Sequence, residues 1–270
     1  MPIAGTTILV TGASSGIGAA LAPMLAARGA TVGIVARRRE RLEQVLAECR
    51  RHAPGSRMWV ADLADLALAE RVAREAWDAF GALDVLVNNA AIPKRKSVID
   101  LTPAEIAEVM DVNFHSPVRM GQAVLPRMIA RRRGMIVNVS SLGGRVGIIH
   151  EAAYCAAKFA LCGWSEVMAI DLAGTGVEVK LVLPGPIETE IWETKPGNLP
   201  AVYQGPFVPA ADCAADIVRA IESDGFEFYA PDTIPGGFTQ KDLVLGKTQD
   251  PGSFLASMAA MAAARPPRSG

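Results

Sequence analysis

The sequence predicts an α/β fold in which a doubly wound parallel sheet of about seven strands has helices on both faces. Short runs rich in β-branched residues alternate along the chain with longer stretches rich in Ala, Leu, Arg and Glu, which is the pattern of repeated βαβ units. Two of the runs, 84–87 and 135–139, are almost continuously apolar, as expected of strands that helices cover from both sides.

The expected strands cover residues 6–10, 31–35, 56–60, 84–88, 135–139, 177–183 and 226–229, and a helix is expected over 210–222. The segment 188–208 contains three prolines and is too long for an ordinary connection in a compact domain, so we expect it to form a lid. Its large apolar side chains include Ile191, Trp192 and Phe207.

We expect a single dinucleotide-binding catalytic domain over residues 1–250, including the loop 188–208, followed by a partly disordered C-terminal tail over 251–270. Within the tail, the apolar stretch 254–264 is only about half as long as a membrane-spanning helix, so it predicts a docked or frayed terminal helix. The Gly- and Pro-rich stretches 231–237 and 265–270 predict irregular or disordered chain.

The composition favours a globular protein that acts on a small molecule. The chain has 270 residues, 50% of them apolar, and a formal net charge of −1, so no global field draws it to nucleic acid or an anionic membrane. Its four cysteines are widely spread, without a C-x-x-C pair or a grouping with histidine, so we expect neither a disulfide nor a metal site. The first expected strand begins almost at Met1, which leaves no room for a signal peptide. These features favour the cytoplasm.

A glycine-rich loop follows the first expected strand and leads directly into a helical stretch. It reads Thr11-Gly12-Ala13-Ser14-Ser15-Gly16-Ile17-Gly18. Its glycines allow a tight turn, close approach of a pyrophosphate to the backbone, and close packing of helix on strand, while amides at the helix N-terminus face the anion. An ordinary glycine-rich turn is the alternative, which the position between strand and helix disfavours. The loop predicts a Rossmann-type site with Gly12, Ser14, Ser15, Gly16, Ile17 and Gly18 as cofactor-binding residues.

No acidic residue stands at the end of the second expected strand, where NAD-selective folds place one for the ribose hydroxyls. Arg37 and Arg38 stand there instead, and a guanidinium fork suits a 2′-phosphate. NADP(H) is therefore favoured over NAD(H), with Arg37 as the main contact and Arg38 as its helper. The alternative is that these arginines form the solvated start of a helix. A similar triplet over 131–133 is interpreted as a solvated loop.

Tyr154 and Lys158 are four residues apart in a helical pattern, which places both side chains on one helix face. Ser141 ends the preceding strand at the carboxyl edge of the sheet, where open α/β folds bind ligands. A tyrosine with a pKa of ~10 exchanges protons poorly at neutral pH unless a nearby ammonium stabilises its phenolate. The pair is a candidate acid–base unit, although Y-x-x-x-K alone is also common as a surface pair.

Together these motifs resemble those of the short-chain dehydrogenase/reductase family over residues 11–189. The resemblance rests on the glycine loop, on Asp62-Leu63, on Asn88-Asn89-Ala90, on Asn113, on Ser141 thirteen residues before Tyr154, on Tyr154-x-x-x-Lys158, and on Pro184-Gly185. It implies the strand order 3-2-1-4-5-6-7 and a homo-oligomer, often a homotetramer, built on long helices over 105–128 and 156–172.

The resemblance also implies roles for single residues. Tyr154 would be the general acid in reduction and the general base in oxidation. Lys158 would lower the pKa of Tyr154 and hold the nicotinamide ribose, Ser141 would hydrogen-bond the substrate oxygen, and Asn113 would anchor a water linking Lys158 to solvent. The further implied cofactor contacts are Asp62 and Leu63 at the adenine, Asn88 and Ala90 along the groove, and Pro184, Ile187 and Thr189 near the nicotinamide carboxamide.

Two positions depart from the family pattern. Ala91 and Ser116 stand where glycine is usual, and each adds a side chain beside the cofactor groove or its helix. His150 either reaches the substrate pocket or is a polar loop residue in solvent. Cys155 is interpreted as a small buried packing residue, and Trp192 as a cover over an apolar substrate.

The sequence therefore predicts an NADP(H)-dependent oxidoreductase that acts on the C=O or CH–OH group of an apolar ketone, aldehyde or alcohol. The alternative is a catalytically silent dinucleotide-binding regulatory protein of the same fold, which would be expected to lose at least one of Ser141, Tyr154 and Lys158. Epimerisation or dehydration on this fold is a third reading, disfavoured because the extended substrate domain of such relatives is not evident in the sequence.

Overall fold

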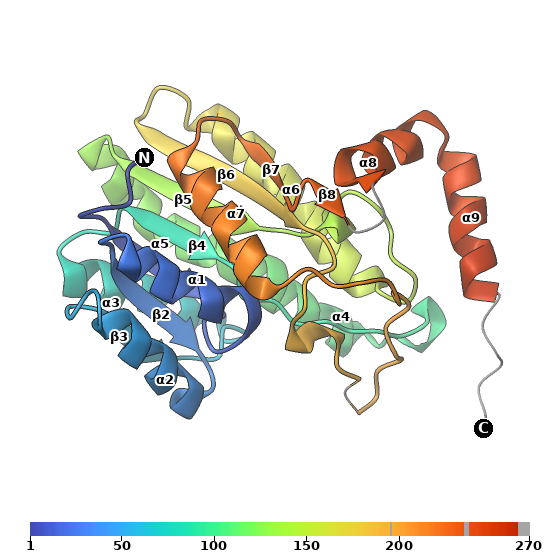
Figure 1. Ribbon diagram of the computed structural model, residues 1–270, viewed down its shortest axis with the longest axis horizontal. Coiled ribbons are helices and arrows are strands. Elements are labelled where there is room, and N and C mark those ends of the chain that lie inside the picture. Colours follow the sequence, from blue (N-terminus) through green and yellow to red (C-terminus); the bar gives the residue numbers. More distant parts are fainter. Residues whose placement is uncertain (195, 235–237, 264–270) are drawn as a thin grey trace.

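The computed structural model describes residues 1–194, 196–234 and 238–263, and it confirms the expected fold class (Figure 1). A parallel seven-stranded sheet runs in the order β3-β2-β1-β4-β5-β6-β7. Its strands are β1 (Thr7–Thr11), β2 (Thr31–Ala36), β3 (Arg57–Val60), β4 (Val85–Asn88), β5 (Gly134–Val139), β6 (Val177–Pro184) and β7 (Glu227–Ala230). Each lies within one residue of its predicted range at both ends, because each coincides with a short β-branched or apolar run.

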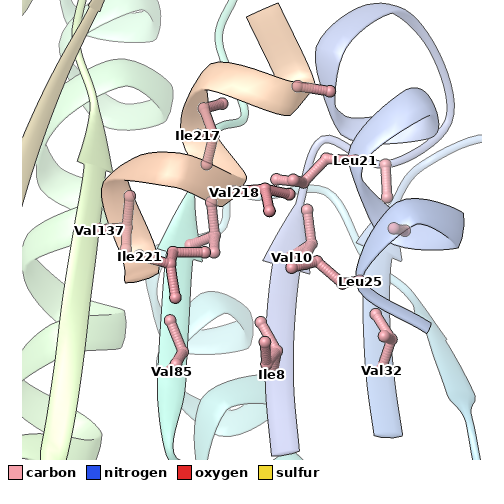
Figure 2. Close-up of a cluster of buried hydrophobic side chains, with 14 of the residues drawn as sticks. Ile8, Val10, Leu21, Leu25, Val32, Val85, Val137, Ile217, Val218 and Ile221 are labelled. Carbon is pink, nitrogen blue, oxygen red and sulfur yellow. The ribbon is translucent and has the colours of Figure 1, made fainter. Parts of the chain in front are cut away.

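Helices cover both faces of the sheet. One layer contains α1 (Gly16–Ala27), α2 (Arg39–Arg50) and α7 (Ala210–Glu222), and the other contains α3 (Leu66–Phe80), α5 (Ser116–Arg131) and α6 (Ala152–Asp171). Alternate residues of β1 serve the two layers. Ile8 and Val10 pack toward α1 and α7, as Figure 2 shows, whereas Leu9 belongs to the core under the other layer. Helices bury both faces of the sheet, so a ligand can reach the sheet only at an edge.

The long helix expected over 105–128 is interrupted. The chain forms α4 (Pro103–Met110), a single π turn over Asp111–His115, and then α5. Within the π turn the amide of Ser116 donates to the carbonyl oxygen of Asp111, five residues back. Because Pro117 has no amide hydrogen, the carbonyl of Asn113 cannot receive an α-helical hydrogen bond from it. The change of helix type therefore falls at Asn113.

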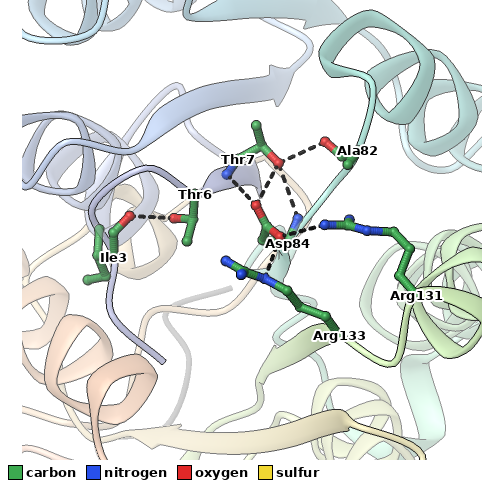
Figure 3. Close-up of polar contacts among 7 residues, drawn as sticks. All are labelled: Ile3, Thr6, Thr7, Ala82, Asp84, Arg131 and Arg133. Atoms are coloured by element: carbon green, nitrogen blue, oxygen red, sulfur yellow. Dashed lines mark hydrogen bonds and ion pairs between the residues drawn. The ribbon is translucent and has the colours of Figure 1, made fainter.

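A charged cluster closes the amino edge of the sheet, opposite the carboxyl edge (Figure 3). The buried carboxylate of Asp84 accepts hydrogen bonds from the backbone amide and the hydroxyl of Thr7, at 3.0 and 3.2 Å. Its other oxygen accepts from Arg131 and Arg133, each at 3.1 Å. Residues 131–133 are exposed, as interpreted, but Arg131 and Arg133 also pair with a buried carboxylate that lies 47 and 49 residues away in sequence.

The segment after the last strand is more regular than expected. β8 (Thr233–Ile234) pairs antiparallel with β9 (Phe238–Thr239), and two helices follow, α8 (Gln240–Gln249) and α9 (Pro251–Ala263). The irregular chain predicted over 231–237 is therefore partly a short ladder, while 235–237 and 265–270 lie outside the described residues. In the described part of the chain, no helix combines the length and apolarity needed to cross a membrane.

Candidate active site

A cavity of about 770 Å³ opens at the carboxyl edge of the sheet. It gathers nearly all the candidate residues into one place, since parallel strands end at the same edge. The candidates that line it are Gly12, Ser14, Ser15, Gly16, Ile17, Arg37, Arg38, Asp62, Leu63, Ala90, Ser141, Tyr154, Lys158, Pro184, Ile187 and Thr189. Gly18, Asn88 and Asn113 do not line it.

The glycine loop has the backbone geometry that only glycine adopts readily. Gly12 and Gly16 have φ angles of 70° and 52°. A side chain at Gly12 would place its Cβ 2.7 Å from the Cα of Ala90, and one at Gly18 would place it 2.6 Å from the carbonyl oxygen of Gly12. Gly18 thus allows the close helix–strand packing expected of the third glycine. The loop leaves the first turn of α1 open toward the cavity, which fits a pyrophosphate.

Thr11 and Asn89, which were not among the expected site residues, join the strands at this end of the sheet. The hydroxyl oxygen of Thr11 accepts hydrogen bonds from the amides of Asn89 and Ala90, at 2.9 and 3.1 Å. The side-chain amide of Asn89 in turn donates to the carbonyl oxygen of Thr11 at 2.9 Å. These bonds join the ends of β1 and β4, so that Ala90 and Ala91 lie along the cavity.

Asn88 does not line the groove, so the expectation for it is wrong. Its side chain is buried and donates to the side-chain oxygen of Asn138 at 2.9 Å, and Asn138 donates to the hydroxyl of Ser165 at the same distance. Asn88 follows Leu86 by two residues, and side chains two apart on a strand share a face. It therefore points into the layer with α5 and α6, and Asn89 is the residue at the cavity.

The two arginines after β2 both lie at the rim, but Arg38 is nearer the glycine loop. Arg38 donates to the hydroxyls of Ser15 at 2.7 Å and Ser14 at 3.2 Å, and it pairs with Glu190 at 2.7 Å. Arg37 extends toward Asp62, 3.6 Å away, and both of these side chains are more than half exposed. Both guanidinium groups therefore lie at the rim of the cavity, each beside a carboxylate.

Ser141, Tyr154 and Lys158 meet at the inner end of the cavity. The hydroxyl of Ser141 caps a short turn over Leu142–Gly144 and accepts from the amide of Gly143 at 3.0 Å. The phenol of Tyr154 is buried, and the ammonium of Lys158 lies 5.8 Å from its ring centre. Tyr154 and Lys158 are one turn apart on α6, so the helix fixes their separation.

Burial dominates the protonation of both groups. Burial raises the pKa of Tyr154, and the hydrogen bond with Ser141 offsets only part of that rise. Burial also lowers the pKa of Lys158 to about 8. The resemblance implied a lowered pKa for Tyr154, whereas the pKa is raised. Removing the phenol from water disfavours its anion more than the neighbouring groups favour it. Tyr154 carries its proton at neutral pH.

Asn113 is fully buried in the π turn rather than exposed to the cavity. Its side-chain oxygen accepts from the amide of Ile92 at 2.9 Å, and its side-chain nitrogen donates to the carbonyl oxygen of Ile92 at 3.0 Å. Asn113 thus ties the helix to the segment that follows β4. Next to it, Ser116 is buried, and its hydroxyl has no hydrogen-bond partner among the described residues.

The outer part of the cavity is apolar. The turn η4 (Glu190–Trp192) contributes Ile191 and Trp192, and the indole of Trp192 packs 5.1 Å from the ring of Phe207. Further lining residues are Ile148, Ile149, Val202, Tyr203, Leu243, Phe254, Met258 and Met261. α8 and α9 therefore form part of the wall, and α9 covers most of the stretch 254–264 that was expected to form a docked or frayed helix.

Two residues near Tyr154 are peripheral to the cavity. His150 is not among its lining residues, and its carbonyl oxygen accepts from the amide of Lys96 at 2.9 Å. Cys155 is buried, and its sulfur accepts from the amide of Ile148 at 3.3 Å. Burial raises the pKa of Cys155 to about 11, which fits a packing residue rather than a nucleophile.

The fold and this cavity define a dinucleotide-binding α/β protein with a Ser–Tyr–Lys group beside the glycine loop. The chain belongs to the short chain dehydrogenase family, whose model matches residues 6–199, and it is an oxidoreductase of that family. It is 34% identical to the NADPH-dependent pterin aldehyde reductase of Arabidopsis thaliana, over 82% of this chain and 91% of that protein. It is 32% identical to the D-threitol dehydrogenase of Mycolicibacterium smegmatis, over 88% of this chain and 94% of that protein.

Among solved structures, the chain is similar to a short chain dehydrogenase from Burkholderia cenocepacia in complex with NADP. The TM-score is 0.78 and the identity 28%, with 96% of this chain and 99% of that chain covered. These findings confirm the resemblance read from the motifs. The two named relatives act on chemically different substrates. Membership of the family therefore indicates the class of reaction, and the substrate has to be inferred from the residues of the cavity.

Proposed function

We propose that the protein is an NADP(H)-dependent oxidoreductase that transfers hydride between the nicotinamide and a carbonyl or secondary alcohol of an apolar substrate. The observation that carries this proposal is that Ser141, Tyr154 and Lys158 line the same cavity as the glycine loop. A dinucleotide held along that loop would supply hydride to the carbonyl carbon. The remaining chemistry is proton transfer and orientation by the protein.

In the reduction direction, Tyr154 donates its hydroxyl proton to the substrate oxygen as hydride reaches the carbonyl carbon. The raised pKa of Tyr154 keeps that proton in place until the oxygen becomes basic. The Ser141 hydroxyl orients the same oxygen. The Lys158 ammonium, charged below a pKa of about 8, stabilises the phenolate that remains. Oxidation of an alcohol uses the same groups in reverse.

The residues around the glycine loop fit the cofactor. Arg37 and Arg38 would contact the 2′-phosphate, and Asp62 and Leu63 would flank the adenine. Pro184, Ile187 and Thr189 would lie near the carboxamide. The NADPH-dependence of the Arabidopsis relative and the NADP in the Burkholderia structure support NADP(H). We also propose that Asn113 anchors a water near Lys158, since Pro117 leaves its carbonyl without an α-helical donor.

The wall of the outer cavity supports an apolar substrate, because side chains such as Ile191, Trp192 and Phe254 would contact its distal part. Exposed apolar side chains on α6, namely Phe159, Val167 and Ile170, support a homo-oligomer, and we propose a homotetramer. The four cysteines are all free and buried, which fits a cytoplasmic location.

Titration of the purified protein with NADPH and NADH, followed by nicotinamide fluorescence, tests the cofactor assignment. The expected result is tighter binding of NADPH, with a selective loss in Arg37→Ala and Arg38→Ala. NADPH oxidation is then assayed with apolar ketones and aldehydes beside polyols and charged carbonyl compounds. A preference for NADH would overturn the arginine assignment, and turnover of charged substrates alone would overturn the substrate class. Binding of NADPH without turnover of any carbonyl compound or alcohol would favour the catalytically silent, dinucleotide-binding alternative.

A further inference from the structure

A buried ion pair lies in the wall of the active-site cavity, and the reaction outlined above does not use it. Arg95 and Glu151 both line the cavity, and their side chains are 1% and 9% exposed. Nε of Arg95 donates to Oε1 of Glu151 at 2.9 Å. Replacing a buried ion pair with apolar residues of similar volume often costs no stability, so stability alone does not explain why this pair is present in the cavity wall.

The remaining donors of the Arg95 guanidinium bind the backbone of the lid. Nη1 donates to the carbonyl oxygen of Glu193 at 3.3 Å, and Nη2 donates to the carbonyl oxygen of Ile191. The guanidinium carbon also lies 5.9 Å from the ring centre of Trp192. The Arg95 side chain therefore contacts three consecutive residues at the end of η4, Ile191, Trp192 and Glu193. Ile191 and Trp192 line the cavity.

The backbone of Arg95 holds the lid at a second place. Its amide donates to the side-chain oxygen of Asn198 at 3.2 Å, and its carbonyl oxygen accepts from the amide of Leu199 at 2.7 Å. Arg95 thus contacts the loop 188–208 at two places, 191–193 and 198–199. Glu151 stands immediately before α6, three residues from Tyr154, and so joins this arrangement to the catalytic helix.

We propose that Arg95 and Glu151 are positioning residues that lock the lid over the substrate pocket and set the place of Ile191 and Trp192 relative to Tyr154. The effect of this pair on catalysis rests on the proposed function, whereas its contacts with the lid do not depend on that function. Glu151 orients the guanidinium, and the guanidinium holds the two carbonyl groups. The substrate then meets a fixed apolar wall instead of a loop that must be ordered on binding.

Arg95→Met tests the proposal, since it removes the charge and the fork but keeps most of the apolar stem. Burial already raises the pKa of Glu151 in spite of Arg95, so the carboxyl left behind can become neutral and the variant is expected to fold. We expect KM for the ketone substrate to rise about 10- to 100-fold, with a smaller change in kcat and in NADPH affinity. Arg95→Lys keeps the charge but not the forked guanidinium, so its KM should lie between those of the wild type and Arg95→Met.

Asp84→Asn is the matched control. Asp84 is also a buried carboxylate bound by arginine, but it lies at the opposite edge of the sheet (Figure 3). It is expected to lower the melting temperature without raising KM. If Arg95→Met raises KM no more than Asp84→Asn does, the pair is only a structural element and the proposal is overturned.

A second readout does not require turnover. Trp192 is half-buried, and its quenching by acrylamide can be isolated by subtracting the signal of Trp192→Phe. We expect stronger quenching of Trp192 in Arg95→Met than in the wild type or in Asp84→Asn. Unchanged quenching would overturn the proposal. If the wild-type protein neither reduces a carbonyl compound nor oxidises an alcohol, the proposed function fails, and the quenching result alone decides whether Arg95 holds the lid.

Discussion

The ammonium of Lys158 donates a hydrogen bond to the carbonyl oxygen of Val139, 2.8 Å away, at the end of β5. This bond holds a lysine that is only 2% exposed on the helix that carries Tyr154. The cost of that burial appears in its pKa, which falls from the usual 10.5 to about 8. Burial of a cation needed for catalysis is a source of instability that can be measured.

Lys158→Met is expected to stabilise the protein below pH 8 while it abolishes most of the activity. The lowered pKa corresponds to a cost on the order of 3 kcal/mol at most, and the loss in kcat should be about 100-fold or more. Because the unfolded chain binds the proton more tightly, the free energy of unfolding of the wild type should rise with pH between about 8 and 10.5. Urea unfolding of both proteins at pH 7 and 10 measures this, and an equal rise in both would contradict it.

Tyr154→Phe should lower kcat by about 100- to 10,000-fold, because it removes the proton donor and keeps the ring. Its affinity for NADPH should stay close to that of the wild type. Tyr229→Phe is the control, since Tyr229 is a buried tyrosine of β7 that is not among the lining residues of the cavity. Steady-state kinetics of both variants check the prediction, and a comparable loss in Tyr229→Phe would show that Tyr154 acts through packing.

Local patterns were sufficient to predict the strands, the glycine loop and the Ser–Tyr–Lys group, since each depends on residues close together in sequence. The errors have a different origin. Choosing between Asn88 and Asn89 required knowing which side of β4 faces the cavity, and that depends on the whole sheet. The Arg95–Glu151 pair joins residues 56 apart with no local signal. Pro117 was a local signal for the π turn at Asn113, but an unbroken helix was predicted there.

Glu190→Gln should tighten NADPH binding more than NADH binding. The carboxylate of Glu190 binds Arg38 at 2.7 Å and also pairs with Arg41. Partial burial alone would raise the pKa of Glu190, but the hydrogen bonds from Arg38 and Arg41 lower it, so the group is charged at neutral pH. A 2′-phosphate must share Arg38 with this carboxylate.

Removing the charge should improve NADPH affinity about two- to fivefold, which is the range for partly exposed ion pairs. Fluorescence titrations at low and high salt measure the change, and the gain should shrink at high salt because of screening. Equal changes for NADPH and NADH would show that Glu190 does not compete with the 2′-phosphate.

Gly18→Ala should weaken both folding and cofactor binding, because the new Cβ would lie 2.6 Å from the carbonyl oxygen of Gly12 and 2.7 Å from Nδ2 of Asn89. One neighbour is backbone and the other is held by Thr11, so neither can yield cheaply. We expect a loss of about 1–3 kcal/mol in unfolding free energy, typical of overpacking. Gly246→Ala in α8 is the control, since its Cβ meets nothing within 4 Å and should stabilise the helix by about 0.5–1 kcal/mol. Urea unfolding and NADPH titration of both variants separate the two effects, and a stable Gly18→Ala that binds NADPH normally would show that α1 can shift away from β1 without cost to the site.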